Sequence, residues 1–146
     1  MRSPFVALPQ AFSYRACLTS DPTNSVPITP PPNYNPQDFE IARRFVLAEL
    51  AAGGRVGSPW GDMPYRAYPS SKPMKHDACC GNGAVGIDAA GLAVGYANAT
   101  RAQRREIAEA HEYYVKGLMW FWRNDSAVPA ALRAQHAALG LCKDEW

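Results

Sequence analysis

The 146-residue sequence lacks an apolar run of the length that a membrane-spanning helix needs, which is roughly 18 residues. It also has little charge, because only 19% of its residues are charged and the formal net charge is +2. So small a surplus gives no electrostatic basis for binding nucleic acid or an anionic membrane. The first ten residues lack the sustained apolar core of a secretory signal. These absences predict a cytoplasmic protein with no nucleic-acid or membrane partner.

Cysteine is scarce, and its spacing is not that of a disulfide framework. The four cysteines are Cys17, Cys79, Cys80 and Cys142, and no two of them have C-x-x-C spacing. Adjacent cysteines such as Cys79 and Cys80 make a poor disulfide, because the bridge strains the peptide between them. We therefore expect reduced thiols, as in a cytosolic compartment.

Histidine is also scarce, but one of the three lies close to two cysteines. His76, Cys79 and Cys80, with Asp77, have the side-chain chemistry of a metal site. They lack the paired ligand spacing that structural zinc sites use, so no metal ligand is assigned. A small metal-binding protein that uses His76, Cys79 and Cys80 remains the weaker alternative function.

What is present is a globular composition, with 47% apolar residues and a length that suits one domain. Alternating apolar residues predict a strand over 11–19, and Thr100 with Gln103 forms a capping box before a long amphipathic segment. Phe39, Ala42, Val46 and Leu50 predict the buried stripe of an earlier helix, which begins at Asn35-Pro36 and ends at Gly53-Gly54. The predicted order is strand 11–19, Pro-rich linker 22–34, helix 36–52, loop 53–98, and helices 101–123 and 129–139.

This order predicts an α+β fold with one or few strands plus three helices, and too few strands to close a sheet of their own. His111 lies on the apolar stripe of the long helix, which favours a core histidine over a catalytic base. The segment from Gly81 to Gly86 is a literal G-x-G-x-x-G. It follows no buried apolar strand, so we interpret Gly81, Gly83 and Gly86 as turn residues in preference to a dinucleotide fingerprint.

Five stretches, taken in order, resemble segments of a family of FAD-dependent oxidoreductases. They are QAFSYRACLT with DPTNSVP (10–27), YNP (34–36), the segment from Lys75 and Asp77 to Asp88 and Gly91 (75–91), HEYYVKGLMWFWRNDSAVP (111–129) and GLCKDEW (140–146). The resemblance covers nearly the whole chain. It implies that residues 1–146 form a partial substrate-side domain of a two-domain flavoprotein, an interior segment that lies over the flavin.

The resemblance implies FAD as the cofactor, yet the FAD-binding βαβ unit of the family is absent from this sequence. We therefore expect an FAD-binding portion or subunit supplied in trans, or self-association through an exposed apolar face. The chain is expected to be inactive alone, and whether it is an enzyme stays open. A truncated or vestigial, non-enzymatic interaction module is the alternative.

Three residues are candidates to face the substrate or flavin, namely Arg15, Asn82 and Asp88. Arg15 could bind an anionic group through bidentate hydrogen bonds, or form a structural salt bridge. Asn82 and Asp88 could orient a substrate or make Asx turns. No catalytic residue is identified. The loop departs from the family pattern at Cys79-Cys80-Gly81 and at Gly86, so the substrate cannot be inferred from it.

Overall fold

The computed structural model describes residues 14–57, 75–78, 85–89 and 91–145. The elements in these ranges are β1 (Ala16–Thr19), β2 (Ser25–Val26), the 3-10 helix η1 (Pro36–Phe39), α1 (Glu40–Ala51), β3 (Lys75–Ala78), the 3-10 helix η2 (Tyr96–Asn98), α2 (Arg101–Asn124), α3 (Ala130–Ala137) and β4 (Gly140–Cys142). Three α-helices and a small sheet make an α+β fold, as predicted. None of the described helices is both long enough and apolar enough to cross a membrane.

The four strands form one antiparallel sheet in the order β2-β4-β1-β3. The sequence prediction that the strands are too few for a sheet is therefore wrong. The predicted linker contains β2, the predicted loop 53–98 contains β3 and η2, and β4 follows the last helix. These strands have two to four residues and, unlike β1, they do not lie in a longer segment of alternating apolar residues. Pairing with β1 and β4, and not local propensity, defines them.

β1 follows the predicted alternation in part. Ala16 and Leu18 are buried, as expected for the apolar face. Thr19 on the expected polar face is also fully buried, and its Oγ1 accepts a hydrogen bond from the Asp21 amide at 3.1 Å. The strand begins at Ala16, and the predicted residues 11–13 lie outside the described ranges.

The first helical segment begins where predicted. The Asn35 side chain accepts a hydrogen bond from the Gln37 amide, and Pro36 occupies the first turn, which is 3-10 in geometry. Gly53 adopts a positive φ of 71° after the last turn of α1. Leu50, which was predicted on the buried stripe, is 43% exposed, because only the first part of that stripe packs against the rest of the protein.

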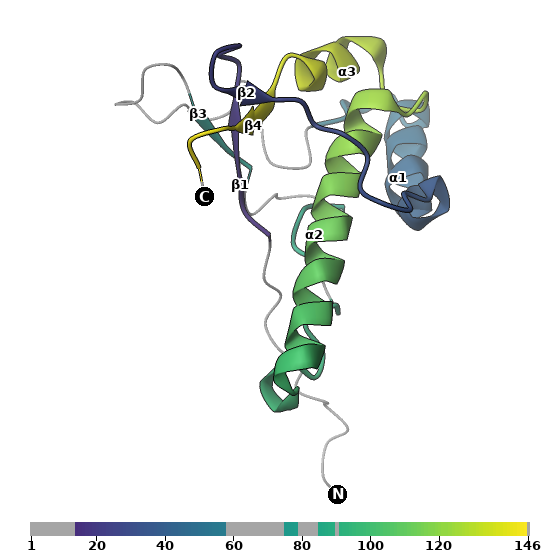
Figure 1. The fold of residues 1–146 in the computed structure, drawn as a ribbon. Coiled ribbons are helices and arrows are strands. Elements are labelled where there is room, and N and C mark those ends of the chain that lie inside the picture. The colour runs from purple at the N-terminus through teal and green to yellow at the C-terminus, as the bar shows by residue number, and fades with distance from the viewer. Residues whose placement is uncertain (1–13, 58–74, 79–84, 90, 146) are drawn as a thin grey trace, which may run out of the picture.

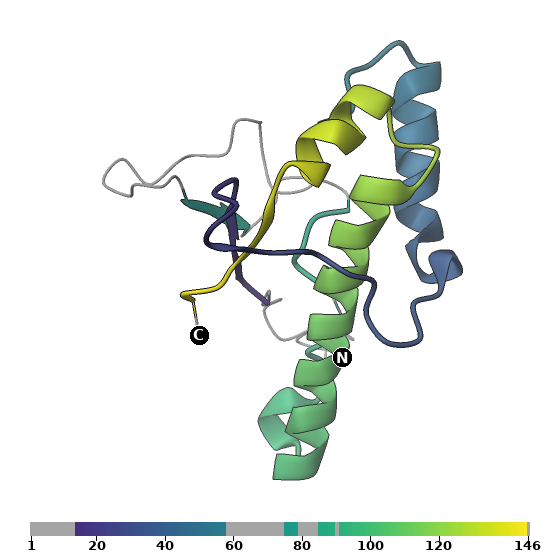
Figure 2. The same cartoon turned by 45° about the horizontal axis from the view of Figure 1, so that its top comes forward.

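α2 is the central element, and it lies between the sheet and α1 in both views (Figures 1 and 2). Its Thr100–Gln103 capping box is formed as predicted. Its C-terminal half is buried, with Phe121 and Trp122 at the centre of the core. His111 is also buried, with its Nδ1 2.7 Å from the Ile107 carbonyl oxygen, so it is a core histidine as expected.

The end of α2 is joined to α3 and β4 by one side chain. The Arg123 guanidinium donates a hydrogen bond from Nη1 to the Leu139 carbonyl oxygen at 2.6 Å. α3 starts after Pro129, which is its N-cap residue, and is shorter than the predicted 129–139. Two residues separate the end of α3 from the start of β4.

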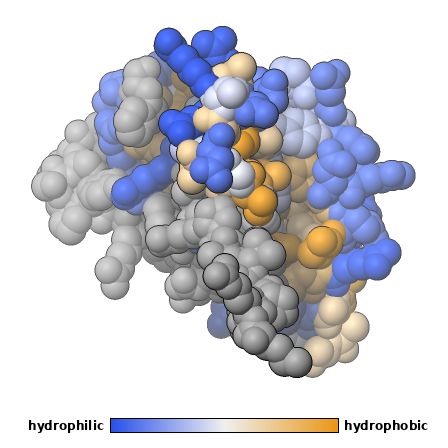
Figure 3. All heavy atoms as spheres, turned by 90° about the horizontal axis from the view of Figure 1, so that it is seen from below, coloured by the Kyte–Doolittle hydropathy of each residue, from blue (hydrophilic) through white to orange (hydrophobic). Residues whose placement is uncertain are grey.

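Apolar residues also reach the surface. Seen from below, apolar residues (orange) show between hydrophilic residues (blue) at the right of the view (Figure 3). The most exposed large apolar side chains are those of Ile41, Val94 and Leu47. Exposed apolar surface of this kind can contact another protein.

Candidate functional site

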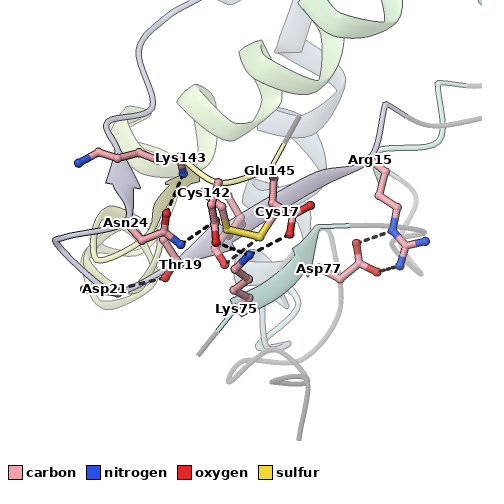
Figure 4. The surroundings of a disulfide bond; sticks show 12 residues. Arg15, Cys17, Thr19, Asp21, Asn24, Lys75, Asp77, Cys142, Lys143 and Glu145 are labelled. Atoms are coloured by element: carbon pink, nitrogen blue, oxygen red, sulfur yellow. Dashed lines mark hydrogen bonds and ion pairs between the residues drawn. A yellow bond between two sulfur atoms is a disulfide. The ribbon is translucent and has the colours of Figure 1, made fainter. Parts of the chain in front are cut away.

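The sheet places two cysteines opposite one another. β1 and β4 pair antiparallel, with Leu18 opposite Leu141 and Thr19 opposite Gly140. The same register puts Cys17 opposite Cys142, and the two form a disulfide with their Cα atoms 5.5 Å apart (Figure 4). The bridge joins positions 125 residues apart in the sequence.

This disulfide corrects the expectation of reduced thiols for Cys17 and Cys142. No pattern in the sequence indicated the pairing, because β4 is too short to be predicted and its register with β1 is a tertiary property. The other two cysteines, Cys79 and Cys80, lie outside the described residues.

A pocket of about 560 Å³ lies beside the disulfide. Its lining comes from β1 and the residues before it, from α2, and from β4 and the residues after it. The lining residues are Tyr14, Arg15, Ala16, Cys17, Val115, Lys116, Met119, Leu141, Cys142 and Glu145. Most of this surface is apolar, while three charged side chains stand at its edge. A mostly apolar pocket of this size with a few polar groups is typical of a small-molecule site.

Arg15 is the one sequence-predicted candidate in the pocket lining. Its Nε donates to Oδ1 of Asp77 at 2.7 Å, and its Nη2 donates to Oδ2 of the same carboxylate (Figure 4). β1 and β3 pair with Cys17 opposite Asp77, which brings this carboxylate within reach of Arg15. The structure therefore shows the salt bridge that was one of the two interpretations, and the guanidinium remains at the pocket edge.

A second ionic cluster holds the residues that follow β4. Lys75 Nζ lies 2.8 Å from Oδ2 of Asp144 and 3.0 Å from Oε1 of Glu145. Asn24 Nδ2 donates to the other Asp144 oxygen at 2.8 Å. These hydrogen bonds raise the pKa of Lys75 and lower the pKa of Asp144. The cluster fixes the segment that carries Glu145 into the pocket wall.

Asp88 and Gly86, the described members of the glycine-rich loop, lie elsewhere. The Tyr114 hydroxyl on α2 donates a hydrogen bond to the Gly86 carbonyl oxygen at 2.8 Å. Asp88 is exposed and is not among the residues that line the pocket. Burial, and secondarily the charge of Asp88, raises the pKa of Tyr114. The candidates Gly81, Asn82 and Gly83 lie outside the described residues.

The metal hypothesis rests on His76, Cys79 and Cys80, of which the structure describes only His76. His76 is buried in β3, with 4% of its surface exposed. Within the described ranges, no three histidine, cysteine or acidic side chains come together as a metal site.

The described residues do not fit a dinucleotide. A dinucleotide-binding unit needs parallel strands joined by a helix, with backbone amides of its glycine loop free to cradle phosphates. Every strand pairing among the described residues is antiparallel. The Gly86 carbonyl is directed to Tyr114. The described strands thus do not form the parallel β-α-β unit that holds a dinucleotide.

Comparison with family models, with curated proteins and with solved structures found no match to this chain.

Proposed function

We propose that this chain is the substrate-side segment of an FAD-dependent oxidoreductase, with FAD bound by a portion supplied in trans. Tertiary contacts between the five family-like stretches support the proposal. All four strands and most of α2 fall within these stretches. Lys75 contacts Asp144, and Tyr114 contacts Gly86, so that each pair joins two different stretches. Stretches that lie far apart in the sequence therefore contact one another in one folded unit, as expected if together they correspond to one domain of the family.

In this arrangement the pocket beside Arg15 is where the substrate would bind. Its mostly apolar walls favour a small, largely apolar molecule whose polar groups lie toward the charged side chains of the lining. FAD would supply the redox chemistry, and this chain would bind and orient the substrate. The proposal places the flavin-binding portion against exposed apolar surface, to which Leu92 and Val94 contribute.

The disulfide bears on the proposed cytoplasmic location. Lasting disulfides are uncommon in the cytosol, where those that occur are mostly transient and redox-active. In a cytoplasmic location we would therefore expect the Cys17–Cys142 bridge to open and close during the life of the protein.

The test compares visible absorption spectra after gel filtration. The neighbouring reading frames are first searched for a strand–GxGxxG–helix unit, which is then co-expressed with this chain. We expect a flavin band in the complex and none in the chain alone. Flavin retained by the isolated chain would disprove supply in trans. A chain that never joins a flavoprotein complex would favour the non-enzymatic interaction module.

A pair of arginine variants makes the test specific to the pocket. Arg15→Met removes the guanidinium at the pocket edge, whereas Arg44→Met removes one on α1 that pairs with Glu40 at 2.9 Å. We expect only Arg15→Met to raise the KM of the complex or to shift its flavin spectrum. Equal effects of the two variants would contradict a pocket role for Arg15.

A further inference from the structure

The disulfide forms part of the pocket wall, because Cys17 and Cys142 both line the cavity. β4 does not depend on the disulfide alone for its position in the sheet. It is paired with β1 on one side and with β2 on the other. Access of the bridge from a pocket is therefore a separate observation that calls for an explanation.

We propose that the Cys17–Cys142 disulfide is a thiol–disulfide exchange site, which accepts a low-molecular-weight thiol through the pocket. This inference does not depend on the proposed flavoenzyme function. The pocket volume of about 560 Å³ is in the range that holds small molecules and is too small for a folded protein segment.

The edge of the pocket is exposed, so that solutes can enter. Tyr14 is 41% exposed, and the side chains of Arg15 and Lys116 are 58% and 37% exposed. The inner walls, by contrast, are the buried side chains of Val115 and Met119. The cavity is thus a cleft with an open edge and an apolar floor.

The greater exposure of the Cys17 residue favours its sulfur as the one that is attacked. Cys17 is partly exposed, whereas Cys142 is 7% exposed. An entering thiolate attacks Sγ of Cys17 and forms a mixed disulfide, while the bond to Cys142 breaks and Cys142 leaves as a thiolate that takes a proton from water. A second thiol then displaces Cys17. In total, two thiols are oxidised to one disulfide, and the protein disulfide is reduced to two thiols.

The charged side chains around the bridge are held in ion pairs. Arg15 and Lys116 at the pocket edge are paired with Asp77 and Glu112. Glu145 is paired with Lys75, which also pairs with Asp144. A thiolate that enters the pocket therefore meets no unpaired carboxylate among the described residues of its lining.

The fold can remain intact when the bridge opens. The Lys143 amide donates to the Asn24 carbonyl oxygen at 2.8 Å, and Lys75 holds Asp144. These bonds and the strand pairing keep β4 in place without the disulfide. Exchange at this site consequently needs no unfolding of the sheet.

The experiment treats the oxidised protein with reduced glutathione under native conditions. A background of Cys79→Ser and Cys80→Ser removes the other two cysteines. After alkylation, trypsin separates the two cysteines into peptides 16–43 and 134–143. We expect a glutathione adduct on peptide 16–43. Reduction that occurs only when urea unfolds the protein, or an adduct confined to peptide 134–143, would overturn the proposal.

A matched pair of variants tests the route of entry. Lys116 lines the pocket, while its ion-pair partner Glu112, one turn earlier on α2, does not. Their side chains are similarly exposed, at 37% and 38%. We expect Lys116→Trp to slow reduction by about tenfold through blocked access, and Glu112→Trp to change the rate by no more than about twofold. Equal rates for the two variants would exclude entry through the pocket. The wild-type measurement tests the exchange itself without any variant.

Discussion

Gly117 of α2 packs directly against the ring of Phe39, which ends η1. A Cβ atom at position 117 would lie 2.8 Å from Cε2 of Phe39 and closer still to Cζ. Real Cβ atoms do not approach other atoms so closely. Only glycine therefore allows α2 and η1 to pack at this separation.

The first prediction is that Gly117→Ala destabilises the protein. Alanine favours a helix more than glycine does, but the added methyl group forces the Phe39 ring to move. We expect a net loss of about 1–3 kcal/mol in the free energy of unfolding, measured by urea denaturation. Phe39→Leu should restore part of the loss in the double variant. Gly57→Ala serves as the control, because a Cβ there meets nothing within 4 Å; a similar loss at both positions would contradict the packing argument.

The sequence predicted those parts of the fold that depend on local interactions. The Asn35 cap, the Thr100–Gln103 capping box and the apolar half of α2 are each encoded within a few residues, and each is present. The sheet was missed because three of its strands are short and are defined by partners far away in the sequence.

The candidate site shows the same division. Arg15 was identified from its polar position on a strand, and it does reach the pocket edge. Its partner Asp77 and the bridge from Cys17 to Cys142 depend on sheet register, which no pattern in the sequence specified. The pocket could have been predicted only from the pairing of β1 with β3 and with β4, which the sequence does not show.

The second prediction concerns pH. Burial lowers the pKa of His136 to about 4 from an ordinary value of 6.5, and the nearby charge of Arg123 acts in the same direction. Between these two pH values the unfolded chain binds a proton that the folded protein does not. Above pH 6.5 His136 is neutral in both states and does not reduce the free energy of unfolding. As the pH falls from 6.5 toward 4, protonation of His136 in the unfolded chain lowers the free energy of unfolding.

This difference corresponds to about 3 kcal/mol at most. Urea denaturation at several pH values between 7 and 4.5 measures it. The His136 ring packs on Trp122 with 5.8 Å between ring centroids, so His136→Phe retains an aromatic ring there. We expect this variant to lose less stability on acidification. An unchanged pH profile would show that other groups cause the loss.

The third prediction tests the contact between α2 and the glycine-rich segment. Tyr114→Phe removes the hydroxyl that donates to the Gly86 carbonyl oxygen, at a cost of about 1 kcal/mol. Amide hydrogen exchange in residues 85–89 should become faster. The neighbouring variant Tyr113→Phe removes a hydroxyl that donates to Asp38, and it should affect η1 instead. Faster exchange of 85–89 in both variants would argue against a specific role of Tyr114.

The fourth prediction is that the Cys17–Cys142 bridge stabilises the fold without being required for it. A disulfide that closes a loop of 125 residues restricts the unfolded chain, with a ceiling of about 5 kcal/mol. We expect the Cys17→Ser, Cys142→Ser double variant to lose about 2–4 kcal/mol of unfolding free energy and to retain the native far-UV circular dichroism spectrum. Wild-type protein reduced with excess thiol should unfold at the same urea concentration as the double variant. A double variant that is unfolded in buffer would show instead that β4 depends on the bridge, because the pairing with β1 and β2 and the Lys75–Asp144 ion pair would then be insufficient to hold it.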